Sequence, residues 1–394
     1  MKNETRSAAT LCAHAGSNPS IAGQNAAVMQ EIAQTTMFHL GDSAEAEEIF
    51  SGTRAGHAYT RFGNPNAESL AATIAALEGG AGALVTSSGN AAILCAVTAA
   101  LADRDGPLVT HGDIYGGSFE LMQILHEIYR VPVEIIDPQN VAAWDKALPE
   151  AGAVLVETPS NPLLKLRDLA KISTVLHKNK TPLIVDNTVA TPFNQSPFAH
   201  GADWIVHSTS KYLNGHSDAI GGCVVKREAL SARDRNIHKN LGGTVNAIDA
   251  WLTLRGLRTF ALRMEKHNAN GAAIATWLQE RSEVGAVHYA GLAQSPQAAL
   301  FSRQMRHGSA LLSFELKGGK AAACQFIDRL KLIIHAVSLG GMESLVSRPA
   351  MSSHRGMGAA GRAAAGISEG LIRLSVGTED LEDLKADLAQ AFGD

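Results

Sequence analysis

Three polar segments that directly follow short apolar runs contain groups able to do chemistry. Lys211, in the segment after residues 204–206, supplies a primary amine that can condense with an aldehyde. Asp186, after residues 183–185, supplies a carboxylate that can pair with a cationic ring nitrogen. The third segment, after residues 83–85, is rich in hydroxyl side chains and glycine. A lone lysine after a strand is most often a solvated side chain, so the combination carries the inference.

The glycine-containing segment is suited to binding phosphate. Backbone N–H groups that follow Ser88 and Gly89 would lie at the start of a helix, where an anion is favoured. Ser208 and Ser210 can add hydroxyl donors to the same anion. Phosphate, aldehyde and pyridinium nitrogen are the three handles of pyridoxal 5'-phosphate. The sequence therefore predicts this cofactor, with its aldehyde bound covalently to Lys211.

The elements that must bring these groups together indicate an α/β fold. Short apolar runs, bounded by Gly, Pro, Asn or Asp, alternate with helical patterns and predict a mostly parallel sheet. The runs are residues 83–86, 107–110, 133–136, 153–157, 182–185 and 204–207. Ligands of such a sheet collect at the carboxyl ends of its strands. The reactive residues fall at those ends.

The chain of 394 residues is longer than one ordinary domain. A helical stretch near residues 246–280 and two strand-like runs, 310–316 and 371–376, indicate a second, smaller α+β unit. The expected divisions are an extended N-terminal arm at 1–60, a cofactor-binding α/β domain at 61–245 and a C-terminal α+β domain at 246–394.

Composition argues against several classes of partner. The formal charge is −4 and there is no basic run, which argues against nucleic acid and anionic membrane. Residues 79–102 are uncharged and long enough to span a bilayer, but polar residues and glycine interrupt them, so we expect a buried strand, a turn and a buried helix. The four cysteines lack CxxC spacing and are expected to be buried, reduced thiols. With a polar start that lacks a signal-peptide core, we expect a cytoplasmic protein.

The segment HSTSKYLNGHSD, residues 207–218, resembles the lysine signature of the Cys/Met-metabolism family of pyridoxal-phosphate enzymes. That family includes cystathionine γ-synthases and lyases, O-acylhomoserine sulfhydrylases and methionine γ-lyases. Further segments resemble family motifs in the same order: AYTRFGNP at 58–65, SSG at 87–89, YGG at 115–117, ETPSNP at 157–162, VDNT at 185–188, SLGG at 338–341 and IRLSVG at 372–377. The resemblance therefore covers nearly the whole chain.

The resemblance implies a pyridoxal-phosphate transferase fold of type I and a homotetramer, a dimer of dimers with active sites shared across each tight dimer. Tyr59 and Arg61 would reach the phosphate of the neighbouring subunit's cofactor, where a guanidinium can bind bidentately. The remaining cofactor contacts that it implies come from Ser88, Gly89, Asn90, Tyr115, Asp186, Ser208, Ser210 and Lys211.

The resemblance also implies the catalytic roles. Tyr115 would stack on the cofactor ring and protonate the leaving group, and Asp186 would keep the ring nitrogen protonated. Lys211, once released by the substrate, would move protons between carbon atoms. The substrate carboxylate would be held by Asn161, Ser338 and Arg373.

Local differences within the family favour the methionine γ-lyase branch and also depart from it. Val337 stands where cystathionine γ-lyases usually carry Glu. Departures from the methionine γ-lyase pattern are Gly117 for a cysteine, Asn90 for a methionine, Gln30–Glu31 for a Pro-Pro pair and the stretch beginning His238–Lys239 for a Lys-Asp pair. We expect these changes near the site to widen the pocket at Gly117 and, through Glu31, to favour a cationic side chain.

The main hypothesis is γ-elimination from a γ-substituted L-amino acid, such as methionine, homocysteine, O-acylhomoserine or canavanine. The usual products would be 2-oxobutanoate, ammonia and the released group, whereas capture by water would give a homoserine-type product instead. The alternatives are γ-replacement, as in an O-acylhomoserine sulfhydrylase or cystathionine γ-synthase, and a cystathionine lyase. A non-catalytic cofactor-binding or regulatory protein is a hypothesis of a different class.

Two features could mislead. Residues 356–361, GMGAAG, match the dinucleotide pattern GxGxxG, but no strand precedes them, so we expect a mobile loop and no nucleotide site. The fifteen histidines show neither HExxH nor another paired metal spacing, so we predict no metal.

Overall fold

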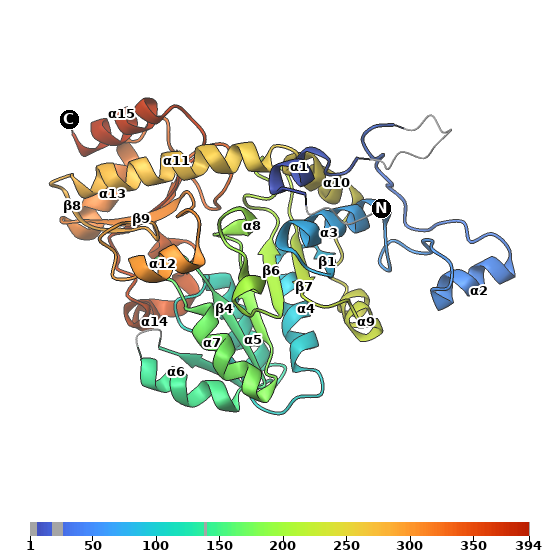
Figure 1. Ribbon diagram of the computed structural model, residues 1–394. Helices are drawn as coiled ribbons and strands as arrows, with labels where there is room; N and C mark the ends of the chain where they lie inside the picture. The colour runs from blue at the N-terminus through green and yellow to red at the C-terminus, as the bar shows by residue number, and fades with distance from the viewer. Residues whose placement is uncertain (1–5, 18–26, 138–139, 394) are drawn as a thin grey trace.

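A seven-stranded sheet forms the centre of the computed structural model, which describes residues 6–17, 27–137 and 140–393. Its strand order is β1-β7-β6-β5-β4-β2-β3, and helices pack around it (Figure 1). All neighbours are parallel except β7, which is antiparallel to both β1 and β6. The strands are β1 Gly82–Thr86, β2 Leu108–His111, β3 Val133–Ile136, β4 Ala153–Glu157, β5 Leu183–Asp186, β6 Trp204–Ser208 and β7 Gly222–Lys226.

The six strands predicted from the sequence are confirmed to within one residue at each end, whereas β7 was not predicted. The uncharged stretch 79–102 forms β1 and the buried helix α4, Gly89–Leu101, as expected. Ser88 caps this helix, because its side chain accepts a hydrogen bond from the backbone N–H of Ala91. In the part of the chain that the structure describes, no helix is both long and apolar enough to cross a membrane.

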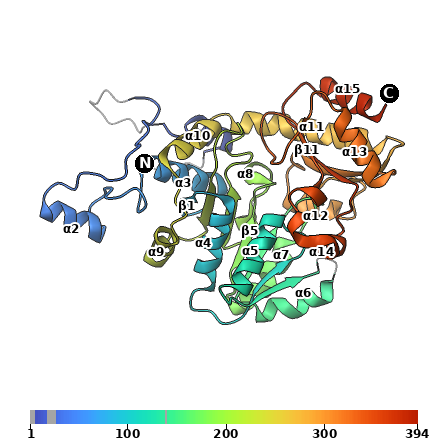
Figure 2. The same cartoon turned by 180° about the vertical axis from the view of Figure 1, so that it is seen from behind.

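A second sheet, in the order β10-β11-β12-β9-β8, follows in the chain. Its strands are β8 Val284–His288, β9 Leu311–Leu316, β10 Ile334–His335, β11 Leu345–Ser347 and β12 Leu371–Ser375, of which β9 and β12 match the predicted runs. The helical stretch predicted near 246–280 is two helices, α10 Ala247–Leu257 and α11 Phe260–Gln279. Figure 2 shows α11 running along one edge of the molecule from α10 toward α13, Gly319–Arg329, and α15, Leu381–Phe392.

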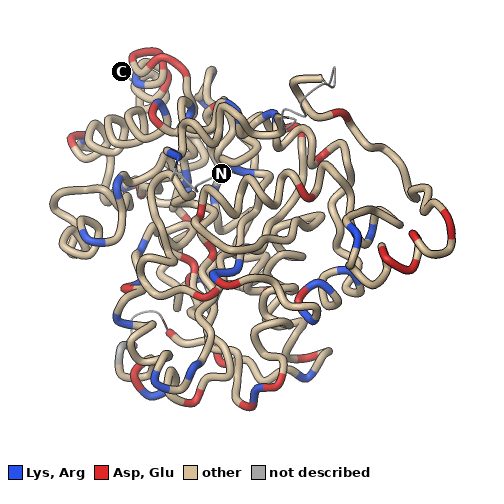
Figure 3. The backbone as a smooth tube through the Cα atoms, turned by 45° about the vertical axis from the view of Figure 1, so that its right-hand side comes forward, with Lys and Arg blue, Asp and Glu red and all other residues tan. Residues whose placement is uncertain are grey.

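The remaining helices connect the strands or precede the first sheet. They are α1 Ala8–Ala13, α2 Ser43–Ser51, α3 Pro65–Glu78, α5 Gly116–Glu127, α6 Val141–Ala147, α7 Leu169–Leu176, α8 Thr191–Asn194, α9 Ala232–Leu241, α12 Ala298–Gln304 and α14 Gly358–Ala365. Helix α1 packs against α3 and α11, and Cys12 on it belongs to the main hydrophobic core. Helix α2 buries no side chain and projects from the body with its acidic residues (Figures 1 and 3). The predicted arm also includes residues 1–5 and 18–26, which lie outside the described residues.

Two predictions were wrong. The GxGxxG segment is not a loop, because Gly358–Ala365 forms α14 directly after a 3-10 turn at Arg355–Met357. Five of the eight residues of α14 are alanine, the best helix former, and this outweighs its two glycines. Cys324 is only half-buried, and its sulfur contacts Nη1 of Arg348 at 3.0 Å.

Candidate active site

One cavity of about 610 Å³ collects nearly all of the predicted site residues. It lies at the carboxyl ends of β4, β5 and β6 and at the start of α4, and its far wall comes from the second sheet and the loops beside it. The predicted residues that line it are Ser88, Gly89, Asn90, Tyr115, Asn161, Asp186, Ser208, Ser210, Lys211, Ser338 and Arg373. Tyr59 and Arg61 lie elsewhere.

Lys211 follows β6 and bridges the two parts of the chain. Its Nζ donates a hydrogen bond of 2.9 Å to Oγ of Ser338, in the loop between β10 and β11. Ser338 has a φ of +93°, a conformation that residues other than glycine rarely adopt and that often marks functional sites. Burial, helped by the positive charge of Arg373, lowers the pKa of Lys211 to about 8. The lysine is therefore still mostly charged at pH 7, but its neutral, nucleophilic form is far more populated than in a lysine with an ordinary pKa.

Arg373, on β12, is a buried cation beside that lysine. Its Nη1 donates to Oδ1 of Asn161 at 3.3 Å and its Nη2 donates to the backbone oxygen of Ser338 at 2.9 Å. Both acceptors are neutral, so an incoming carboxylate would supply a countercharge. Burial lowers the pKa of Arg373 to about 10, which still leaves it charged near neutral pH.

Asp186 ends β5 and lies in register with Glu157 at the end of β4. Oδ1 of Asp186 accepts a hydrogen bond of 2.9 Å from the backbone N–H of Thr188. Burial raises the pKa of Asp186, while this hydrogen bond and the nearby His207 act in the opposite direction. Asp186 also lines the cavity, so its carboxylate is available to a cationic group inside it.

The start of α4 borders one end of the cavity, where a helix N-terminus would favour an anion. A Cβ atom at Gly89 would lie 2.9 Å from Cβ of Ser208, so glycine is required for this close approach of helix and strand. The side-chain amide of Asn90 donates to the backbone oxygen of Gly117 at 3.2 Å. The hydroxyl of Ser210 both donates to and accepts from the backbone of Gly221.

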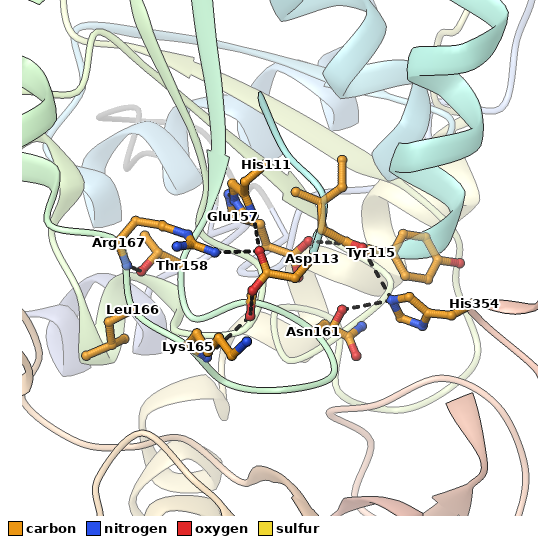
Figure 4. Close-up of polar contacts among 12 residues, drawn as sticks. His111, Asp113, Tyr115, Glu157, Thr158, Asn161, Lys165, Leu166, Arg167 and His354 are labelled. Carbon is orange, nitrogen blue, oxygen red and sulfur yellow. Dashed lines mark hydrogen bonds and ion pairs between the residues drawn. The ribbon is translucent and has the colours of Figure 1, made fainter. Parts of the chain in front are cut away.

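Buried residues that sequence reasoning missed support Tyr115 from behind (Figure 4). Oε2 of Glu157 accepts a hydrogen bond of 2.6 Å from the backbone N–H of Tyr115. His354 donates from Nε2 to the backbone oxygen of Asn161 at 3.0 Å, and burial lowers its pKa to about 4. The local sequence around Glu157 and His354 does not indicate their hydrogen-bond partners, because those partners lie far away in the sequence. For Glu157 the available signal was its place in the ETPSNP motif.

Tyr59 and Arg61 lie on the arm side of the molecule, beside Thr244 and Asn246 in a shallower cavity. Nη1 of Arg61 donates to the backbone oxygen of Lys239 at 2.8 Å, and its guanidinium lies 4.9 Å from the centre of the Phe62 ring. A single chain therefore does not bring either residue to its own cavity.

Two of the four departures lie at this chain's own cavity, and for the other two a place near a site shared with a neighbouring subunit stays a prediction. Asn90 lines this cavity, and Gly117 lies directly beside Tyr115. His238, in contrast, hydrogen-bonds the backbone oxygen of Val85 at 2.7 Å and lines no part of it, and Glu31 is exposed on the arm.

The family model described as Cys/Met metabolism PLP-dependent enzyme matches residues 9–393. The chain belongs to this family. It is 40% identical to the L-methionine gamma-lyase of Pseudomonas deceptionensis, over 93% of each chain. It is 41% identical to the cystathionine gamma-synthase of Escherichia coli K12, over 85% of this chain and 87% of the relative.

Solved structures of the family share the fold. The cystathionine gamma synthase of Xanthomonas oryzae pv. oryzae in complex with cystathionine superposes with a TM-score of 0.89 at 40% identity, over 98% of each chain. The cofactor of this Cys/Met-metabolism enzyme is pyridoxal 5'-phosphate. The cavity fits that cofactor, because it joins an amine at Lys211, a carboxylate at Asp186 and a glycine-bordered helix start flanked by Ser208.

Proposed function

We propose that this enzyme catalyses γ-elimination from an L-amino acid that carries a leaving group on Cγ. The products would be 2-oxobutanoate, ammonia and the released group. If water instead adds at Cγ, the products would be homoserine, which keeps its amino group, and the released group. The observation that carries the proposal is the hydrogen bond from Lys211 to Ser338 beside Arg373, within the cavity that Tyr115 lines. The cavity thus contains an amine that can carry protons, on Lys211, a cation that can bind a carboxylate, on Arg373, and a phenol that can donate a proton, on Tyr115.

Each residue has a distinct part in the proposed reaction. Bound pyridoxal phosphate supplies the electron sink for negative charge that develops on the substrate carbons. Arg373 and Asn161 bind the substrate carboxylate and so orient Cα toward Lys211. Nζ of Lys211 accepts the proton from Cα and later one from Cβ, and its lowered pKa favours the neutral form that this requires. The hydroxyl of Tyr115 protonates the departing group, and the carboxylate of Asp186 keeps the ring nitrogen protonated.

γ-Replacement is the second candidate. Two observations favour it: synthase relatives match as well as lyase relatives, and a second cavity of about 510 Å³ shares Val337 and Ser352 with the first. We propose that space for the second substrate, because it adjoins the first cavity at the two shared residues. A cystathionine lyase activity would use the same space for the far end of cystathionine.

The proposed site includes the neighbouring subunit of a homotetramer. Apolar residues of the arm are exposed in the single chain, among them Val28 and Met37, whose exposed fractions are 78% and 69%. Burying such side chains against another subunit is favourable. Packing of this arm on a second copy is the arrangement that would bring Tyr59 and Arg61 to a cofactor phosphate.

A substrate panel tests the proposal. Purified holoenzyme is incubated with methionine, homocysteine, O-acylhomoserine and canavanine, and 2-oxobutanoate and homoserine are measured with and without added sulfide or cysteine. γ-Elimination predicts one of these products without a second nucleophile. Homocysteine or cystathionine formed in their place assigns the enzyme to γ-replacement. Absence of both product classes, together with no exchange of the Cα proton in D₂O, would indicate a non-catalytic protein.

A further inference from the structure

Glu157 and Asp186 place two carboxyl groups side by side in the wall of the cavity. They are register partners on neighbouring parallel strands, which lie about 4.8 Å apart, so both side chains point to the same face of the sheet. Glu157 is only 5% exposed, whereas Asp186 is half-buried and faces the cavity. Two adjacent carboxylates in a buried site do not both ionise readily, because each disfavours the charge of the other.

Glu157 also fixes the loop that carries Tyr115. Its Oε2 accepts the backbone N–H of Tyr115 at 2.6 Å, and its own backbone N–H donates to Nε2 of His111 at 3.0 Å. Because Nε2 of His111 is an acceptor, the ring proton is on Nδ1, which donates to Asp113 at 2.6 Å. The loop from β2 to α5 is therefore held at Asp113 and at Tyr115, as Figure 4 shows.

The surrounding charges separate the roles of the carboxyl groups. Asp113 pairs with Arg167, whose Nη2 lies 2.5 Å from its Oδ1, and Asp186 accepts the N–H of Thr188. Within the described residues, Glu157 has no ion pair closer than 4 Å. Burial first, and then the charges of Asp186 and Asp113, raise its pKa well above the ordinary range. The backbone N–H groups of Tyr115 and Asn161 act in the opposite direction on this pKa, and Arg373 is a nearby cation.

We propose that Glu157 is a positioning residue that works as a neutral carboxylic acid. One oxygen of Glu157 accepts the backbone N–H of Tyr115. Because Glu157 is protonated, Asp186 is the only negatively charged member of this carboxyl pair. This inference rests on the proposed function, in which Asp186 faces the cationic ring nitrogen of the cofactor. A negative charge on Glu157 would repel the charge on Asp186 and so raise the tendency of Asp186 to take up a proton. A neutral Glu157 avoids this repulsion and still accepts the hydrogen bond from the N–H of Tyr115.

Infrared spectroscopy of the holoenzyme tests the protonation state without any substrate. A protonated carboxyl group has a carbonyl stretch that an ionised carboxylate lacks. We expect this band in the wild type at neutral pH and expect Glu157→Gln to remove it, while Glu382→Gln, at an exposed glutamate on α15, leaves it unchanged. A spectrum in which Glu157→Gln removes only ionised-carboxylate bands would overturn the proposal. Because no turnover is involved, this result is independent of whether γ-elimination itself is correct.

Kinetics of two variants test the positioning role. Glu157→Gln keeps an oxygen that can accept from the N–H of Tyr115. If Glu157 is neutral, the substitution does not change the charge of the site. In that case kcat should stay within about threefold of the wild-type value and the pH profile of kcat/KM should not move. Glu157→Ala leaves that N–H without its acceptor and should lower kcat about tenfold to a hundredfold. A shifted pH profile in Glu157→Gln, or equal kcat losses in the two variants, contradicts a neutral positioning acid.

Discussion

The ring of Tyr115 lies directly against the α-carbon of Gly117. A Cβ atom added at Gly117 would be 2.6 Å from Cε1 and 3.2 Å from Cζ of that ring. Tyr115 is 40% exposed and lines the cavity, so its side chain has room to move. The missing side chain at position 117 therefore gives the phenol a resting position that any other residue would close.

Substitution of Gly117 by alanine should displace the Tyr115 ring. A phenol that protonates the leaving group contributes about 10²–10⁴-fold to the rate, so a misplaced ring should lower kcat by about tenfold or more. Stability should change by less than about 0.5 kcal/mol, since the ring can swing into open space. Steady-state kinetics and thermal unfolding measure both effects. Gly285→Ala is the control, because its added Cβ would find its nearest neighbour at 3.6 Å; equal kcat in all three proteins would contradict the role of Gly117.

Cofactor binding by the apoenzyme should depend on the protonation of Lys211. Only the neutral amine attacks the aldehyde, and its fraction rises with pH through the folded-state pKa of about 8 and then saturates. The rate of reconstitution, followed by absorbance after pyridoxal phosphate is added, should therefore be half-maximal near pH 8 and level off above it. Arg373→Met removes a positive charge that lowers this pKa, so its curve should move to higher pH, while Arg303→Met on the exposed face of α12 should not move it. A rate that still rises steeply at pH 10 in the wild type would contradict the shift.

Lys211→Ala removes the amine and should abolish covalent binding of the cofactor. Mass spectrometry after borohydride reduction should find the cofactor attached to the wild type and not to the variant. Turnover should fall to background, because the same amine carries the protons in the proposed reaction. Covalently retained cofactor in Lys211→Ala would place the attachment at another residue.

Strand-end chemistry was predictable from the sequence because it is local. The apolar runs that became β5 and β6 are buried on both faces, and their reactive residues follow within a few positions. Strand β7 was missed because its short run after Gly221 forms a strand only through antiparallel pairing with β1 and β6. Its existence depends on tertiary contacts that propensity does not encode.

The support of the site was not predictable for a related reason. Glu157 ends β4 and Asp186 ends β5, with helix α7 between the two strands in the sequence, and only the register of β4 with β5 makes these residues neighbours. The same holds for His354, whose partners Asn161 and Ile114 lie in other elements. Sequence patterns report faces and termini of single elements, whereas these contacts are set by how several elements pack.

Arg373 should be needed for the carboxylate of the substrate and not for its side chain. Arg373→Met should raise KM and lower kcat/KM. The loss should correspond to roughly 2–5 kcal/mol of binding free energy, because the buried pair of Arg373 with the substrate carboxylate loses one partner. Arg373→Lys should recover part of this loss, since it keeps the charge but not the bidentate geometry. The check is to compare each amino acid with its carboxamide. The wild type should have a much higher kcat/KM for the amino acid than for its carboxamide. An equally large preference in Arg373→Met would show that Arg373 does not bind the substrate carboxylate.

The buried pair of Glu78 and His207 should stabilise the sheet behind the cavity. Oε1 of Glu78 lies 2.6 Å from Nε2 of His207 and also accepts from the side-chain amide of Asn187 at 2.8 Å. Both side chains of the pair are fully buried, so removal of either partner by alanine substitution should cost about 3–5 kcal/mol in the free energy of unfolding. The double variant should lose less than the sum, which urea unfolding of the four apoproteins measures as a coupling energy. The pair of His57 and Glu68 is the control. Nε2 of His57 lies 3.2 Å from Oε2 of Glu68, whose side chain is 63% exposed, so the coupling energy should be about 0–1 kcal/mol. Equal coupling energies for the two pairs would show that burial does not strengthen the first.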